Sequence, residues 1–563
     1  MSFDPESKIL RSAYSPMPIP KGLTYSRLMV NALSKHGDSV CQIGAVSGRR
    51  QTYREVLQAS YRLACSLQRL GLQPGDLVGV RCGLILEFLV TALAVIRAGC
   101  TLLSVRGETI REFKYQLEDS KPSLVFAEPE HCPRMLEAAK GLSNFKAIGK
   151  VMAQKREREG RQQKVASHGV VSYGDCEGCT SYDDLVAEGE ALTLREPALD
   201  PREAVMVITY SGGTTGAPKG VMLTHHNFVA TQIMWDAWTA ALPVANARVV
   251  RPVTLDWMPP VHLSGIVTVL GNCLRGCTQV LLSSTETEDI FAAIEKYRIT
   301  HVPLMPTRLM TLANSPLASK YNLTSWTSAG LGGGVLPTSI IEDFKEKFKL
   351  DHLYFGYSMT ELTGFMTMPT TNPESIGSPF PMTEIKVVDI ETKESLGPNE
   401  DGEICARGPQ VMKGYINNKE ATDQTIDADG WLHTGDVGHF DDDGNVCVVE
   451  RVKDLIRCMD VHVVPAELEQ LLLSHPAVAE ALVVGLPHPQ LGEAPRAFVV
   501  LAEGVSADDA LAQELLLHVS EQVEHAMQLH GGLEFVSDLP KSATGQYLRR
   551  ELRSNFLRQH RTA

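Results

Sequence analysis

Along the first half of the chain, segments with the helical periodicity of apolar residues alternate with short strand-like runs. Apolar side chains recur at helical spacing in the segment 52–71, which predicts an amphipathic helix, and the run 76–83 is typical of a short strand. The same succession returns between residues 204 and 357. The β-rich runs there are 205–211, 278–284 and 300–306. Such alternation predicts layered α/β structure with parallel sheet.

The most apolar stretch of the chain is Phe88–Ile96, which is bounded by Glu87 and Arg97. It is far shorter than a membrane span, so it predicts a buried helix and no transmembrane segment. The first residues show no apolar core beside basic residues, as a secretory signal would, and the C-terminal RQHRTA lacks an SKL-type peroxisomal tripeptide. We therefore expect an intracellular protein, with a cytoplasmic location as the default.

The pattern changes after Gly402 to short strands separated by turns, and Asp443 with Gly444 predicts a hairpin between two of them. A second change follows Lys453, where strand-like and helical runs predict a small α+β unit. We place the domain boundary within Glu450–Asp454.

Composition and charge narrow the class of protein. A chain of 563 residues exceeds what one hydrophobic core usually supports, so two or more domains are expected. Apolar residues make up 44% and charged residues 21%, as in folded globular proteins. The formal net charge of −14 argues against nucleic acid as a main partner, because phosphate backbones are held by basic surfaces.

Two short features carry no assigned chemistry. Cys176 and Cys179 form a lone CxxC among twelve cysteines. Without a second cysteine or histidine pair at ligand spacing, two loop thiols are favoured over a zinc site. The polar and basic stretch Gln154–Glu177 has little to bury, so we expect a surface excursion and assign it no function.

The strongest chemical signal is the string TYSGGTTGAPKGVMLTHHN at 209–227, in which a β-rich run ends in a loop of glycines and hydroxyl residues. Glycines let backbone N–H groups approach phosphate oxygens, hydroxyl groups donate further hydrogen bonds, and a lysine adds charge. A Walker loop is excluded, because Ala217 and Pro218 separate the last glycine from the lysine. The residues predicted to bind phosphate are Ser211, Gly213, Thr214, Thr215, Gly216 and Lys219.

This string resembles the phosphate loop of the adenylate-forming superfamily, which includes acyl-CoA synthetases, 4-coumarate CoA ligases and luciferases. Further motifs follow in the family's order. They are WMPPVHLSG at 257–265, YFGYSMTELTG at 354–364, GEICARGPQVMKGY at 402–415 and GWLHTGDVGHFDDDGNVCVVERVKD at 430–454. The resemblance covers nearly the whole chain, from about Tyr53 to Arg553, and several motifs in order are far more specific than one.

The resemblance implies roles for the motif residues. Tyr357 would stack on the adenine, Thr360 would contact a phosphate, and Glu361 would hold Mg²⁺ or its water. These roles make chemical sense, because an aromatic face suits a purine and a carboxylate oxygen suits a hard cation. Asp436 and Arg451 would hold the ribose, since a carboxylate accepts two hydroxyl donors and a guanidinium can brace the same sugar.

The resemblance also implies an acyl pocket and a hinge. The pocket would be bordered by His262 and by Gly332, Gly333 and Gly334, whose small size hints at a roomy site. Lys453 falls at the family's hinge. The implied fold is α/β, with a multi-sheet AMP-binding N-terminal domain at 1–452, β-rich from about 366, and a small mobile α+β C-terminal domain at 453–563.

The sequence departs from the family at the reacting centre. In LPKSATGQYLRREL, residues 539–552, Gln546 stands where the family has a catalytic lysine. Losing one such electrostatic contact typically costs about 10²- to 10³-fold in rate. Asp460 and His462 replace a usual Gly and Gln on the face that would help to admit CoA, which also puts the thioester step in question.

The expected activity is that of an acid–thiol ligase. A fatty or aromatic carboxylic acid would react with ATP and Mg²⁺ to give an acyl-adenylate, which the CoA thiol would then attack. The catalytic candidates are Lys219, His262, Thr360, Glu361 and Gln546. Two alternatives stay open: a degenerate relative that binds nucleotide or acyl ligand with weak adenylation because of Gln546, and a luciferase-like monooxygenase.

Overall fold

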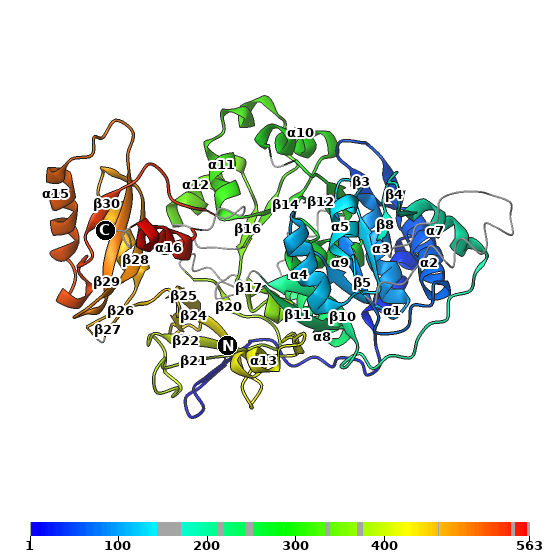
Figure 1. Cartoon of the computed structure of the whole chain (residues 1–563), viewed down its shortest axis with the longest axis horizontal. Coiled ribbons are helices and arrows are strands. Elements are labelled where there is room, and N and C mark those ends of the chain that lie inside the picture. The colour runs from blue at the N-terminus through cyan, green and yellow to red at the C-terminus, as the bar shows by residue number, and fades with distance from the viewer. Residues whose placement is uncertain are drawn as a thin grey trace.

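The computed structural model describes residues 2–142, 170–211, 218–241, 251–284, 286–332, 338–368, 375–459, 461–541 and 547–559. Figure 1 shows a large body formed by the blue to yellow part of the chain and a smaller unit at one end formed mainly by the orange part. Helices and strands alternate through the large body. The expected mixed α/β class with a separate C-terminal domain is confirmed.

The first sheet of the large body has eight strands among the described residues, in the order β23-β11-β10-β6-β5-β7-β8-β9. Neighbouring strands run parallel from β10 to β9, whereas β11 and β23 are added antiparallel at the other edge. The strands are β5 (Leu77–Arg81), β6 (Thr101–Ser104), β7 (Leu124–Ala127), β8 (Val170–Ser172), β9 (Thr180–Ser181), β10 (Val205–Ser211), β11 (Lys219–Thr224) and β23 (Gly414–Tyr415).

Strand β8 corrects one expectation from the sequence. Most of the stretch Gln154–Glu177, predicted to be a surface excursion, lies outside the described residues, but its end contains Val170–Ser172, which forms a buried strand. These three residues pair in parallel with β7, and the side chains of Val170 and Val171 enter the core. A run of three residues is too short to predict a strand from the sequence. It becomes part of a sheet only because β7 is there to pair with it.

The second sheet, counted over the described residues, has seven strands in the order β16-β15-β14-β12-β13-β3-β4. All neighbours run parallel except the edge strand β4. The strands are β3 (Val40–Gly44), β4 (Arg50–Thr52), β12 (Val253–Asp256), β13 (Thr278–Leu281), β14 (His301–Leu304), β15 (Ser328–Leu331) and β16 (His352–Phe355). The parallel sheets expected from the alternating pattern are therefore present.

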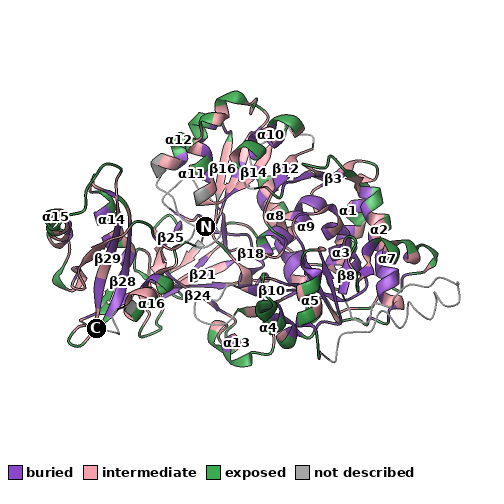
Figure 2. Ribbon diagram, turned by 45° about the horizontal axis from the view of Figure 1, so that its top comes forward, coloured by how far each residue is buried: buried purple, intermediate pink, exposed green. Residues whose placement is uncertain are grey.

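Helices pack between and around these two sheets. They are α1 (Tyr25–His36), α2 (Tyr53–Arg69), α3 (Leu86–Arg97), α4 (Ile110–Ser120), α5 (Cys132–Ala138), α7 (Tyr182–Glu188), α8 (His225–Ala241), α9 (Leu263–Leu274), α10 (Thr287–Tyr297), α11 (Pro306–Asn314) and α12 (Thr338–Phe348), with short 3-10 turns at Gly189–Ala191, Pro316–Lys320 and Thr360–Leu362. One core cluster joins side chains of both sheets to α1, α2, α3 and α9. Figure 2 shows buried residues concentrated in this region.

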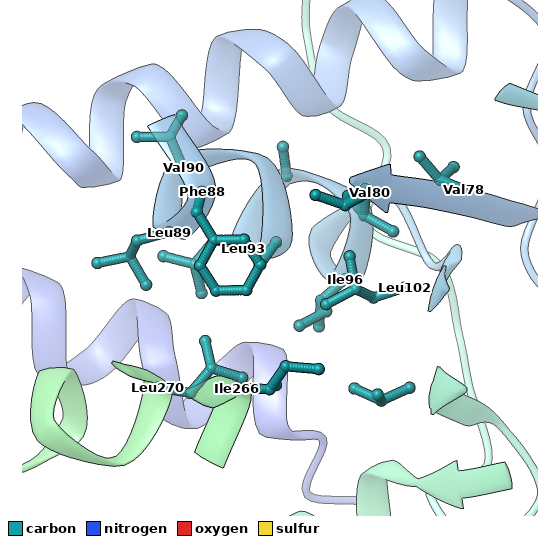
Figure 3. Close-up of a cluster of buried hydrophobic side chains, with 14 of the residues drawn as sticks. Val78, Val80, Phe88, Leu89, Val90, Leu93, Ile96, Leu102, Ile266 and Leu270 are labelled. Carbon is teal, nitrogen blue, oxygen red and sulfur yellow. The ribbon is translucent and has the colours of Figure 1, made fainter. Parts of the chain in front are cut away.

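Helix α3 illustrates how the sequence places the core. Nearly every residue of α3 is buried, which confirms the buried helix predicted for Phe88–Ile96. Figure 3 shows Phe88 facing Ile266 and Leu270 of α9, and Ile96 near Leu102 of β6. A helix that is apolar on all sides must be covered on all sides, so α3 lies in the interior.

A third, antiparallel sheet follows the first two. Its order within the described residues is β1-β2-β21-β22-β24-β25. The strands are β1 (Ser2–Asp4), β2 (Ile9–Arg11), β21 (Glu384–Val388), β22 (Gly402–Arg407), β24 (Leu432–Phe440) and β25 (Val446–Arg451), accompanied by the pairs β17 (Ser358–Met359) with β18 (Gly364–Phe365) and β19 (Thr367–Met368) with β20 (Ser378–Pro379), and by α13 (Lys419–Thr425). The sequence pattern missed β1 and β2, which join β21 from the N-terminus.

The hairpin predicted at Asp443 and Gly444 is confirmed. Strands β24 and β25 pair antiparallel, and Gly444, at φ 77°, donates its N–H to Asp441 O at 2.9 Å. The positive φ is the conformation that glycine adopts without strain. This hairpin places Asp436 directly opposite Arg451.

The C-terminal unit has its own sheet and core. Among the described residues the sheet is β27-β26-β29-β28, with β30 paired to β29. Its elements are β26 (Ile456–Cys458), β27 (Val461–Val463), α14 (Pro465–Leu473), β28 (Val478–His488), β29 (Gly492–Leu501), α15 (Asp509–Ser520), a 3-10 turn at His525–Met527, β30 (Leu533–Phe535) and α16 (Arg549–Gln559). The predicted α+β character is confirmed. The chain changes sheet between Arg451 and Ile456, while the division at 452/453 stays a prediction.

Within the described parts of the chain, no helix is long and apolar enough to cross a bilayer.

Candidate active site

The predicted phosphate loop connects two antiparallel strands. Strand β10 ends at Ser211 and β11 begins at Lys219, and these two residues are direct partners in the ladder. The Ser211 hydroxyl donates to Lys219 O at 3.4 Å. The predicted phosphate ligands Gly213, Thr214, Thr215 and Gly216 lie outside the described residues. The hairpin thus brings two of the predicted phosphate ligands together at the end of the first sheet.

Lys219 and Glu361 are connected through a residue that sequence reasoning missed. Strand β23 pairs with β11 and carries Tyr415, whose ring centroid lies 4.8 Å from Lys219 Nζ. The Tyr415 hydroxyl donates to Glu361 Oε1 at 2.9 Å. Glu361 is only 8% exposed, and its backbone carbonyl accepts from Met412 N–H at 2.8 Å. The ring therefore lies between the predicted phosphate-binding cation and the predicted metal-binding carboxylate.

The predicted ribose ligands form a second cluster around Asp436. Arg451 Nε lies 3.3 Å from Asp436 Oδ1, and the Tyr357 hydroxyl donates to Asp436 Oδ2. Burial raises the pKa of Asp436, whose residue is 7% exposed, while the Arg451 charge and the Tyr357 hydroxyl act against that rise. Burial and the Asp436 charge raise the pKa of Tyr357, so its hydroxyl keeps the proton that it donates.

One short segment links the two clusters. Tyr357 follows β16, and Thr360 and Glu361 form the 3-10 turn that comes directly after β17. Tyr357 contacts Asp436, whereas Glu361 contacts Tyr415. Residues 357–361 therefore span the space between the β24–β25 hairpin and the β10–β11 hairpin. A ligand with a sugar at one end and phosphates at the other matches this arrangement of donors and acceptors.

His262 lies beside the same region. It precedes α9, and its N–H donates to Pro259 O at 3.0 Å. Burial, together with the nearby charge of Arg106, lowers the pKa of His262 to about 4, so the ring is neutral at neutral pH. Gly265 permits the tight turn before the helix, because an added Cβ would lie 2.3 Å from Pro259 O.

Arg106 is a further residue that the sequence did not single out. Its guanidinium Nη1 donates to Tyr210 O at 2.6 Å, next to Ser211, and burial lowers its pKa. The guanidinium of Arg106 is therefore bonded next to β10's end, and its charge acts on His262. No local motif marks this arginine, and its position follows only from the pairing of β6 with β10.

The predicted acyl-pocket glycines follow β15. Gly332 donates its N–H to Leu304 O at 3.1 Å, and a Cβ added to it would meet nothing within 4 Å. Gly333 and Gly334 lie outside the described residues. At Gly332 there is therefore room for a Cβ.

The predicted hinge lies beside the Asp436 cluster. Burial, followed by the charge of Arg451, lowers the pKa of Lys453 to about 8. Next to it, Arg549 of α16 contacts Glu450 at 3.3 Å across the two domains and also pairs with Glu469 of α14. The C-terminal domain is thus held against β25 by a buried ion-pair network. Gln546, the departure from the family's lysine, lies outside the described residues.

Comparisons with known proteins identify the family of the chain. The model of the family described as AMP-binding enzyme matches residues 30–416, and that of the AMP-binding enzyme C-terminal domain matches 467–546. The chain is 32% identical to a luciferin 4-monooxygenase of Nipponoluciola cruciata over 549 residues, covering 95% of each chain. It is 33% identical to 4-coumarate–CoA ligase 2 of Oryza sativa subsp. japonica over 566 residues, covering 97% of this chain and 95% of the relative.

A solved structure supports the same conclusion. ATP-bound MatB from Rhodopseudomonas palustris superposes with a TM-score of 0.79 at 25% identity, covering 95% of this chain and 99% of that one. The fold and these matches together define an ATP-binding α/β enzyme with a small C-terminal domain. The chain belongs to the AMP-binding enzyme family, within the adenylate-forming superfamily, as the motifs led us to expect.

Proposed function

We propose that this protein is an ATP-dependent acid–thiol ligase that activates a carboxylic acid as an acyl-adenylate and transfers the acyl group to CoA. The observation that carries the proposal is the segment 357–361, which joins the Tyr357–Asp436 contact to the Glu361–Tyr415 contact. A single nucleotide bound along this segment would have its ribose at Asp436 and its phosphates near Lys219. Relatives named as 4-coumarate–CoA ligases support the proposed reaction.

In the first step, a carboxylate oxygen of the substrate attacks the α-phosphorus of ATP and the bond to pyrophosphate breaks. Lys219 and the hairpin donors would hold the departing phosphates, and Asp436 with Arg451 would fix the ribose so that the α-phosphate faces the acid. Glu361 would hold Mg²⁺, which offsets the negative charge of the phosphates. The protein's part is therefore mostly positioning and charge stabilisation.

In the second step, the CoA sulfur attacks the acyl carbon, the bond to AMP breaks, and the thiol proton passes to solvent or to a base. We propose that the C-terminal domain moves about Lys453 between the two steps, which would require the Arg549–Glu450 contact to open. His262, neutral at neutral pH, and Gly332 would border the acyl group. A cytoplasmic location stays a prediction from the sequence.

The test is a panel of fatty and aromatic acids assayed for pyrophosphate, AMP and thioester. We expect acid-dependent pyrophosphate release that falls at least about tenfold in Asp436→Asn, because the amide loses the negative charge and replaces one of the two acceptor oxygens by a donor. Asp423→Asn, on the exposed helix α13, is the matched control and should behave as the parent protein. The proposal would be refuted if pyrophosphate release were the same with and without the acid, and the same in Asp436→Asn as in the parent protein.

A second candidate is a relative with weak adenylation, because Gln546 brings no charge to the reacting centre. Gln546→Lys would then raise pyrophosphate release about 10²- to 10³-fold, whereas Gln546→Ala, which adds no charge, would not. Brisk release by the parent protein with no gain in the lysine variant would dismiss this candidate.

A third candidate is a luciferase-like monooxygenase, which has only the adenylation step in common with the proposed ligase. Relatives named luciferin 4-monooxygenase match the chain at 31% to 32% identity, about as well as the ligases do. Oxygen-dependent light from a luciferin with ATP would support a luciferase-like reaction. Darkness under conditions in which a known luciferase emits would exclude it.

A further inference from the structure

Three cysteine side chains converge at the edge of the eight-stranded sheet farthest from Lys219. Cys132 begins α5, and Cys176 and Cys179 lie in the connection between β8 and β9. Their sulfur atoms all lie within 4.8 Å of one another, and none is in a disulfide. The sequence showed no further ligand near the CxxC of Cys176 and Cys179. The fold brings a third thiol, that of Cys132, from a different segment of the chain.

The topology explains why these thiols meet. Strands β7 and β8 are parallel neighbours, with Ala127 opposite Ser172. The segments that follow their carboxyl ends therefore begin side by side, at the same end of the two strands. Cys132 lies in the first of these segments and Cys176 in the second. A tight turn then brings Cys179 back beside Cys176. Its N–H donates to Cys176 O at 3.3 Å, and Gly178, at φ 83°, supplies the positive φ.

The environment is suited to soft ligands. Cys132 is fully buried, whereas Cys176 and Cys179 are half-buried and pack against the same apolar cluster. The cluster is therefore closed on the protein side and reachable through its two outer thiols. Another group in the described residues, Glu403 with Cys405 and His433, differs, because His433 Nδ1 already pairs with Glu403 at 2.9 Å.

We propose that Cys132, Cys176 and Cys179 form a zinc site that is separate from the nucleotide site and structural in role. Zn²⁺ would bind three thiolates, with water or another donor in the fourth position, and three protons would be released to solvent. Zn–S bonds of about 2.3 Å in a tetrahedral site place sulfur atoms about 3.8 Å apart. Each pair would therefore close by about 1 Å or less from the observed limit of 4.8 Å.

The role follows from the position of the ligands. Cys132 precedes the stretch 143–169 and the other two thiols follow it, so one ion would fasten the two ends of this part of the chain. It would also fix the short edge strands β8 and β9 to α5. The sheet order places the site at the opposite edge from β11 and β23, which carry Lys219 and Tyr415. Zinc binding is therefore expected to change the stability of the fold more than it changes the affinity for nucleotide.

The experiment uses the full-length, reduced protein after removal of metal by a chelator. Titration with Zn²⁺ in competition with a chromophoric chelator should show one tight equivalent, and Cd²⁺ should give thiolate-to-metal absorption in the ultraviolet. Cys176→Ser and Cys179→Ser should each weaken zinc binding about 10²-fold or more, and zinc should raise the Tm of the parent protein but not that of either variant. Both residues are partly exposed, so these variants should fold even if Cys132→Ser does not.

Cys447→Ser is the matched control, because Cys447 is also partly exposed but lies on β25. It should bind zinc as the parent protein does. The proposal is overturned if the parent protein takes up no tight zinc, or if the Cys176 and Cys179 variants bind it as well as the control. Loss of ATP binding in the same variants would contradict a separate structural site.

Discussion

Replacing Tyr357 by phenylalanine tests the proposed ribose site with the smallest possible change. The substitution removes one hydroxyl and keeps the ring that would stack on adenine. In the structure this hydroxyl donates to Asp436 Oδ2, while Arg451 Nε lies 3.3 Å from Oδ1. A hydrogen bond to a charged group contributes about 1.5–3 kcal/mol. If that bond holds the carboxylate in place for the sugar, its loss weakens ATP binding about 10- to 150-fold.

The same substitution changes the pH dependence of binding. Burial raises the pKa of Asp436, and Tyr357 and Arg451 hold it down, so removal of the hydroxyl lets the pKa rise further. Ribose hydroxyls donate to the ionised carboxylate, and protonation removes acceptor capacity. ATP affinity therefore falls as the pH falls through the pKa of Asp436, and in Tyr357→Phe this fall begins at a higher pH.

Calorimetric titration with ATP at several pH values measures both effects. Tyr297→Phe is the control, because it loses a hydroxyl that donates at 2.9 Å to the neutral Ala45 O, outside the site. A double-mutant cycle with Asp436→Asn then isolates the pair. The reasoning is refuted if Tyr357→Phe binds ATP like the parent protein at every pH, or if the two substitutions act independently.

Three further outcomes are expected. Burial raises the pKa of Asp256 from 3.8 to about 7, so the folded state binds this proton more tightly than the unfolded chain. Its stabilising contribution is full below about pH 4 and is lost as the pH rises towards 7, with a slope of up to about 1.4 kcal/mol per pH unit. Urea unfolding of Asp256→Asn should lack this slope, and an unchanged pH profile would contradict the assignment. Tyr415→Phe removes the donor to Glu361, so kcat/KM for MgATP should fall about tenfold, and unaltered kinetics would count against the proposed metal ligand. Arg549→Ala leaves Glu450 without its partner from the C-terminal domain and should cost about 3 kcal/mol in unfolding free energy, with faster proteolysis near the hinge; equal cleavage rates would argue against the contact.

Much of the fold was predictable because its signals are local. A continuous apolar run can be satisfied only by burial on all sides, and Phe88–Ile96 accordingly forms the interior helix α3. The Asp443–Gly444 turn forms the β24–β25 hairpin, whose pairing sets Asp436 opposite Arg451. The change of pattern after Lys453 corresponds to a unit with its own sheet and core.

Other features were absent from any local pattern. Strands β1 and β2 are three residues each and are stabilised by pairing with each other and with β21, far along the chain. The buried strand β8 was mistaken for surface because a three-residue run has little periodicity. Short strands acquire their identity from their neighbours, so a single sequence cannot reveal them.

The candidate site shows the same division. The sequence by itself predicted which residues would carry the chemistry, since Lys219, Tyr357, Glu361, Asp436 and Arg451 lie in contiguous motifs. Only the tertiary structure decided what surrounds them. Tyr415 reaches Glu361 through the pairing of β23 with β11, Arg106 lies beside His262 through the pairing of β6 with β10, and Cys132 joins the CxxC through β7 and β8. Sheet pairing brings together residues separated by many positions in the chain, and the sequence holds no local periodicity that records which strands will meet.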